Sequence, residues 1–159
     1  PLTPRSLHRR APARPSLKEW FHVDRPESLL ARVVGEIFGE SVSVVLEDAS
    51  AKRPQTYLAH LHSREHGRRA YLCATYEWFE LRIVDLDATV EVFDYDDDEA
   101  DKYDALRELG LVAHAYLSGE GHIESKPRLF RRGTNRSITL DLQGRQWKLG
   151  RHWSSVPYP

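Results

Sequence analysis

The chain has 159 residues, a formal net charge of −1 at pH 7 and a single cysteine. A chain of this length is expected to form one domain with a real hydrophobic core, since folding buries roughly 70% of its unfolded surface. The lone Cys73 excludes an internal disulfide and favours a reducing compartment. No apolar run approaches the ~18 residues of a membrane-spanning helix, and the first twenty residues contain no apolar segment typical of a signal peptide. These features predict a cytoplasmic protein that does not enter a membrane.

The near-zero net charge hides a strong separation of charge along the chain. Residues 1–18 carry five cations and no acid, and residues 76–104 carry twelve acids against Arg82 and Lys102. Residues 126–152 carry eight cations against Asp141 alone. Such blocks predict oppositely charged surface regions, which steer encounters with charged partners.

The N-terminal part predicts an arm followed by a helix. Residues 1–15 contain four prolines and few apolar side chains, which predicts a flexible basic arm ahead of a single domain at 16–159. A helix is predicted from Asp24, because Asp24 and Glu27 match a capping box and Pro26 suits the first turn. It is predicted to end at Gly39 in a left-handed cap, after apolar residues at helical spacing: Leu29, Leu30, Val33, Val34, Ile37 and Phe38.

Short segments rich in β-branched and aromatic residues predict strands joined by hairpins. We place them at 42–47, 56–63, 69–77, 79–85, 89–94, 129–132, 136–142 and 145–149, with a turn around Gly67. A second helix is predicted to begin with an aspartate cap at 96–98 and to end at Gly110. Residues 111–117 alternate small and large side chains, so they form either a strand, which we favour, or a continuation of this helix. The predicted fold is an α+β domain, an antiparallel sheet covered by two helices.

The sequence His60-Leu61-His62 is the sharpest chemical feature of the chain. Residues two apart on a strand point to the same face, so the two imidazoles predict a pair of ligands for a divalent metal. A His-hydrophobe-His strand resembles the motif of the HUH replication and transposition nucleases. That resemblance implies a bound metal, a third ligand from Glu65, His66 or Glu77, and a tyrosine nucleophile. The tyrosines that the resemblance would assign are Tyr103 or Tyr116.

Further candidate residues are a pair of histidines, the lone cysteine and a basic aromatic segment. His114 and His122 would approach each other if 111–125 formed a hairpin, whereas Cys73 between Leu72 and Ala74 predicts a buried apolar residue. The basic C-terminal part places Arg131, Arg132 and Trp147 in one segment, a pattern that suits single-stranded nucleic acid.

No nucleophile, base and orienting group occur together at consistent positions, so the sequence favours a binding module over an enzyme. In size, class and charge the chain is similar to bacterial immunity proteins, which neutralise a toxin by covering it. The similarity implies a protein partner and no cofactor; the alternatives are a metal-dependent phosphodiesterase or a nucleic-acid-binding module. Acids would steer the encounter and aromatic rings would anchor it. The predicted contact patch comprises the acids from Glu77 to Asp104, among them Glu80, Asp97 and Asp98, and the rings Tyr76, Trp78, Tyr95 and Tyr103.

Overall fold

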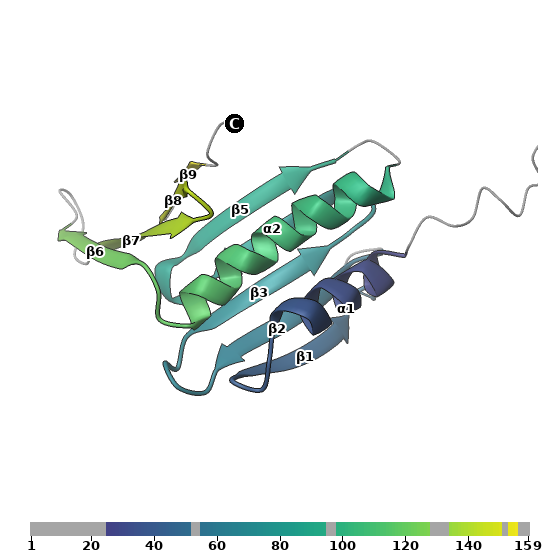
Figure 1. Cartoon of the computed structure of the whole chain (residues 1–159), viewed down its shortest axis with the longest axis horizontal. Coiled ribbons are helices and arrows are strands. Elements are labelled where there is room, and N and C mark those ends of the chain that lie inside the picture. Colours follow the sequence, from purple (N-terminus) through teal and green to yellow (C-terminus); the bar gives the residue numbers. More distant parts are fainter. Residues whose placement is uncertain (1–24, 52–54, 95–97, 128–133, 151–152, 156–159) are drawn as a thin grey trace, which may run out of the picture.

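The computed structural model describes residues 25–51, 55–94, 98–127, 134–150 and 153–155. Within them the chain forms two helices and two antiparallel sheets, which confirms the predicted α+β fold. Figure 1 shows both helices on one face of the larger sheet, with the smaller sheet beside β5. Buried residues of both sheets and both helices form one continuous hydrophobic cluster.

The larger sheet is a meander in which each strand pairs with the next along the chain. Its strands are β1 (Val42–Asp48), β2 (Tyr57–Ser63), β3 (Arg69–Ala74), β4 (Trp78–Ile83) and β5 (Ala88–Phe93). The hairpin turn predicted around Gly67 is present, and Gly67 adopts a φ of 63°, a conformation that glycine takes without steric cost. Between β4 and β5 a short 3₁₀ turn, η2 (Val84–Leu86), ends at Asp87 in the left-handed region.

Alternate residues of this sheet point to opposite faces, and one face packs against the helices. Ala59, Leu61, Leu72, Phe79 and Leu81 are all almost fully buried on that face. The alternation of buried and half-buried residues therefore assigns every strand position to one face of the sheet.

Helix α1 (Pro26–Ile37) contributes the buried side chains that its spacing predicted, and Pro26 occupies the first turn as expected. The predicted cap residue Asp24 lies outside the described residues; the observed N-cap is Arg25, which makes no side-chain capping bond. The predicted left-handed cap at Gly39 is wrong, because Phe38 leaves the helix in an extended conformation with φ −99° and ψ 116°.

Helix α2 (Glu99–Leu117) begins at an aspartate cap, as predicted, with the Asp98 carboxylate accepting the N–H of Ala100 at 2.8 Å. The strand favoured for 111–117 is wrong, because the helix runs on through Gly110 to Leu117. A buried stripe recurs at helical spacing through the disputed segment: Leu106, Leu109, Val112, Ala113, Tyr116 and Leu117.

Gly110 is an interior packing residue of α2 and does not end the helix. A Cβ atom at this position would lie 2.7 Å from Ile37 Cδ1 and 3.2 Å from Val33 Cγ1 of α1. The missing side chain lets the two helices approach closely, so the glycine serves the helix contact.

The smaller sheet has the order β6-β7-β8-β9 and packs against the β5 end of the larger one. Its strands are β6 (His122–Pro127), β7 (Thr134–Leu142), β8 (Arg145–Gly150) and β9 (Trp153–Ser155). The strand predicted at 129–132 and the basic arm predicted at 1–15 both lie outside the described residues. Ile138, Leu140, Trp147 and Leu149 of this sheet are buried in the shared core.

Candidate functional site

The second face of the larger sheet is free of the two helices, and we call it the open face. It carries polar, aromatic and charged side chains in place of the aliphatic residues of the helix face. In strand order they are Ser43, Val45, Glu47; Leu58, His60, His62; Arg69, Tyr71, Cys73; Trp78, Glu80, Arg82; and Thr89, Glu91, Phe93.

The strand register divides the open face by charge. Glu47, Glu80 and Glu91 share one cross-strand row with Leu58 and Cys73. The next rows, toward the β2–β3 turn, carry the basic and imidazole side chains of His60, His62, Arg69 and Arg82. Opposite charges therefore occupy opposite halves of one surface.

The end of the open face near the β3–β4 turn gathers rings and carboxylates, and we call it the acidic-aromatic end. It consists of Trp78, Glu80, Glu91 and Phe93 on the open face, together with Tyr76 and Glu77 in the adjacent β3–β4 turn. Trp78 lies opposite Phe93, and Glu80 lies opposite Glu91. The N–H of Asp94 donates to the carbonyl of Glu77, so both of those pairs are of the non-hydrogen-bonded kind, in which side chains lie closest.

The rings at this end are exposed to a degree that is unusual for large apolar side chains. Phe93 keeps 57% of its surface accessible and Tyr76 keeps 37%, while Trp78 is half-buried. Two like-charged carboxylates, Glu80 and Glu91, stand side by side next to them, an arrangement that costs up to about 1 kcal/mol in a sheet. The pattern combines exposed anchors with a local negative potential.

Thr75 fixes the turn that presents Tyr76 and Glu77. Its side-chain oxygen accepts the N–H groups of Glu77 at 3.3 Å and Trp78 at 3.0 Å, and it donates to the Trp78 carbonyl at 2.9 Å. The backbone N–H of Thr75 also donates to the Trp78 carbonyl. The two-residue loop is therefore rigidly held, and Tyr76 starts from a defined backbone position.

The structure brings together some of the contact residues expected from the sequence and separates others. Tyr76, Glu77, Trp78 and Glu80 lie together at the acidic-aromatic end. Asp98 caps α2. Tyr103 lies on the helix side, where its hydroxyl donates to Glu36 and the Arg32 guanidinium stacks 4.2 Å from its ring centre. Trp147 keeps only 2% of its surface, so its ring packs in the core and does not face a partner. Tyr95, Asp97, Arg131 and Arg132 lie outside the described residues.

Phe93 belongs to the acidic-aromatic end but was not among the predicted contact residues, whereas Glu91 lies within the predicted run of acids from Glu77 to Asp104. The place of both residues in this end follows from the β4–β5 pairing, which places positions 78 and 80 opposite 93 and 91. A prediction of that register required the geometry of the η2 turn, and the sequence Val84-Asp85-Leu86-Asp87 is not a standard hairpin signal.

His60 and His62 share the open face, as the predicted strand requires. His60 Nε2 lies 2.7 Å from Glu47 Oε2, and its ring meets Tyr71 edge-on with centroids 4.8 Å apart. Among the described residues no group of three or more histidine, cysteine or acidic side chains is arranged to hold a metal ion. His60 is engaged by a carboxylate and a ring, and the pair would need further ligands to bind a metal.

The tyrosines that the nuclease resemblance would assign as nucleophiles lie across the sheet from these histidines. Tyr103 and Tyr116 belong to α2, which packs on the helix face of β3 and β4. The hairpin considered for 111–125 is absent as well: His114 lies in α2 with its ring tilted against Phe38, centroids 5.9 Å apart, and His122 pairs with Thr139 in the smaller sheet. The structure therefore does not bring these tyrosines to the His60-Leu61-His62 strand.

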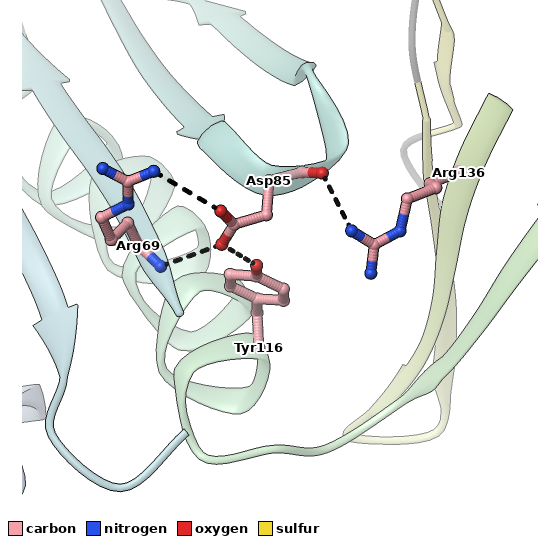
Figure 2. A network of polar contacts seen from close by, with 4 residues as sticks. All are labelled: Arg69, Asp85, Tyr116 and Arg136. Atoms are coloured by element: carbon pink, nitrogen blue, oxygen red, sulfur yellow. Dashed lines mark hydrogen bonds and ion pairs between the residues drawn. The ribbon is translucent and has the colours of Figure 1, made fainter. Parts of the chain in front are cut away.

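A second polar cluster surrounds Asp85 in the η2 turn, as Figure 2 shows. Its carboxylate accepts the Tyr116 hydroxyl at 2.8 Å and the backbone N–H of Arg69 at 3.3 Å, and it lies 3.7 Å from the Arg69 guanidinium. Its carbonyl accepts Arg136 of β7 at 3.4 Å. Burial, and then the bond to Asp85, raise the pKa of Tyr116 well above its ordinary value. The phenol is thus held neutral as a donor, which suits a structural tie between β3, α2 and β7.

Two hollows on the described surface are small. One of about 170 Å³ lies on the open face beside Val45, His60 and Tyr71, and one of about 130 Å³ lies between η2 and β7. Pockets for drug-sized ligands or cofactors hold about 300–1,000 Å³, so neither of these two hollows reaches that size.

Comparison of the chain with protein-family models, with curated proteins and with solved structures found no match. Neither of the two described helices has the length and apolar content that a membrane crossing requires.

Proposed function

We propose that the chain is a non-catalytic protein-binding module that uses the acidic-aromatic end of its open face. The observation that carries the proposal is the grouping of Tyr76, Trp78 and Phe93 with three glutamates on one exposed end of a rigid sheet. Interfaces draw most of their binding energy from a few aromatic anchors, and charge complementarity increases the rate of encounter.

The chemistry of this end favours a cationic polypeptide as partner. Glu77, Glu80 and Glu91 repel phosphate groups, which argues against nucleic acid as the ligand of this surface. Lysine or arginine side chains of a partner would complement the charges of Glu80 and Glu91. Apolar groups between those cations would cover Trp78 and Phe93.

The site is also preorganised, which lowers the entropic cost of binding. The Thr75 hydrogen bonds fix the turn, and the cross-strand pairs hold the remaining residues on the sheet. A rigid sheet surface that needs no closure suits tight inhibition or adaptor binding, in keeping with the similarity to immunity proteins.

The proposal can be tested by selecting peptides from an unbiased displayed library against the purified full chain. We expect the selected peptides to be net positive, with apolar residues between the cations. Their affinity, measured by isothermal titration calorimetry, should fall at least about tenfold in the Glu80→Lys/Glu91→Lys variant and in the Trp78→Ala/Phe93→Ala variant.

A charge-matched control separates this site from general electrostatics. The Glu40→Lys/Asp104→Lys variant makes the same charge change at exposed positions beyond α1 and on α2, and should bind within about threefold of the unmodified chain. Selection of acidic or neutral peptides, or equal losses in the two lysine variants, would refute the proposed site.

A further inference from the structure

The outer edge of β1 has no strand beside it among the described strands, because β1 lies at one end of the sheet order. In Figure 1 it forms the free margin of the larger sheet, away from the smaller one. Its sequence, VSVVLED, contains no proline or lysine, the residues that commonly protect such an edge. Val45 keeps 59% of its surface accessible and Leu46 keeps 52%, so both sides of the edge expose an aliphatic group.

The hydrogen bonds between β1 and β2 show which backbone groups point outward. The N–H of Ala49 donates to the Thr56 carbonyl, and the N–H of Arg64 donates to the Ser41 carbonyl. In an antiparallel pair only alternate residues bond to a given neighbour, so the odd positions of β1 face β2. The even positions, Val44 and Leu46 at the centre, therefore direct their N–H and C=O groups to the free edge.

An antiparallel copy of β1 matches this edge when its centre lies at Val45. In that register Val44 of each chain lies opposite Leu46 of the other. The backbone groups of these residues point outward, so the two pairs exchange about four hydrogen bonds. Val45 meets Val45 of the copy on the two-fold axis in a non-hydrogen-bonded pair, where side chains lie closest. The N–H of Val42 already bonds to the Gly39 carbonyl, so the strongest pairing is confined to this centre.

The same register also avoids contacts between like charges. Glu47 lies opposite Ser43 of the copy and Asp48 lies opposite Val42, so neither acid meets an acid. The three central pairs, formed by Val44, Val45 and Leu46, are aliphatic, and each outer pair joins an acidic residue to a neutral one. The strand carries two carboxylates and no cation, so this register keeps its acids apart. A strand of another protein would have to reproduce this pattern, whereas a second copy supplies it by symmetry.

We propose that the chain forms a two-fold symmetric dimer by antiparallel pairing of β1 with β1, centred on Val45. The two five-stranded sheets then join into one continuous sheet, with the helices of both copies on the same side. The acidic-aromatic ends remain on the open face of each copy, so the dimer presents the proposed binding site twice.

Disulfide trapping tests the register directly. In the Val45→Cys variant the two introduced thiols face each other across the axis, within the Cα separation of less than about 7 Å that a disulfide tolerates. In the Ser43→Cys variant they are offset by four residues, about 13 Å along the strands. We expect rapid covalent dimer formation under mild oxidation for the first variant only; the native Cys73 is buried and present in both.

Sedimentation equilibrium tests the dimer without a crosslink. The Val45→Lys variant should dissociate at least about tenfold more readily, because two lysines would meet on the axis. The Thr89→Lys variant is the control, since Thr89 is exposed in the same cross-strand row at the opposite edge of the sheet, and should leave the dimer unchanged.

A monomeric wild-type chain together with an uncrosslinked Val45→Cys variant would overturn the proposal. Equal trapping of the two cysteine variants would overturn it as well, because it would indicate collisions without register. Equal dissociation of the two lysine variants would show that the dimer uses another surface.

Discussion

Replacing Tyr116 with phenylalanine should destabilise the fold by about 1.5 kcal/mol at neutral pH. The residue keeps 1% of its surface exposed, and its hydroxyl donates to the Asp85 carboxylate at 2.8 Å. A hydrogen bond to a charged group contributes roughly 1.5–3 kcal/mol. We expect the lower end of that range, because the Asp85 side chain is 30% exposed and retains Arg69. Phenylalanine preserves the ring packing, so the loss reports on the hydroxyl.

The same variant should change how stability depends on alkaline pH. Burial and the Asp85 carboxylate raise the pKa of Tyr116 in the folded protein above the value of ~10 of an unfolded tyrosine. As the pH rises, the unfolded chain therefore releases this proton before the folded protein does. The stabilisation of the folded state by the protonated hydroxyl is complete below pH ~10 and declines above it. By pH 11 the free energy of unfolding has lost about 1.4 kcal/mol of this stabilisation. Because the phenylalanine variant has no such proton, its stability deficit should nearly vanish near pH 11.

Urea unfolding followed by tryptophan fluorescence, from pH 7 to 11, measures both effects. The Asp85→Asn variant and the double variant complete a thermodynamic cycle, which should give a coupling energy of about 1 kcal/mol between the two side chains. A deficit that stays constant from pH 7 to 11 would refute the raised pKa. The absence of a deficit at neutral pH would show that the hydroxyl bond adds nothing to stability.

Four further substitutions test packing, capping and the open face. Gly110→Ala should lower the free energy of unfolding by about 1 kcal/mol, because a tight contact with α1 outweighs the gain in helix propensity. Gly35→Ala, with open space around it, should raise the free energy of unfolding by about 0.5–1 kcal/mol. Chemical denaturation measures both. Arg68→Ala should lower the thermal midpoint by several degrees, since its guanidinium donates to two carbonyls at the end of α2, at 2.6 and 3.3 Å. Glu91→Lys should stabilise the fold by about 0.5 kcal/mol, because its contact with Glu80 becomes attractive. The same change should weaken the binding of the selected basic peptides. A thermal melt and a peptide titration on the same sample measure the two effects.

The sequence predicted the larger sheet well because its signals were local. Alternation along each strand and the turn at Gly67 set the positions of β1 to β5 within a few residues. Helix α1 was equally clear, because its apolar positions repeat at helical spacing. Cys73 was expected to be buried, and it keeps only 4% of its surface accessible.

The errors arose where tertiary contacts decide the structure. Gly110 has the appearance of a helix stop, but its missing Cβ serves the close contact between α1 and α2. The segment 111–117 alternates small and large side chains, yet the core selects its helical stripe. Trp147 sits among arginines and lysines in the sequence, and strand alternation nevertheless turns it inward.

The candidate site could be predicted only in part, because it depends on pairing between strands. Tyr76, Trp78, Glu80 and Glu91 were expected from the run of acids and rings, whereas Phe93 joins them only through the β4–β5 register. The tie around Asp85 could not be foreseen, since it connects positions 69, 85, 116 and 136 from four separate elements.

Under the proposed function, the two faces of the larger sheet divide stability and recognition between them. The helix face holds the aliphatic core; Asp85 ties α2 to β7 of the smaller sheet, and Arg68 ties the β2–β3 turn to the end of α2. The open face holds side-by-side carboxylates and exposed rings, which a sheet optimised only for stability would replace with opposite charges and smaller side chains. The free-energy cost of these carboxylates and rings is confined to one end of one face of a well-packed sheet. Binding of a partner can recover this cost while the core remains unchanged, as a recognition surface requires.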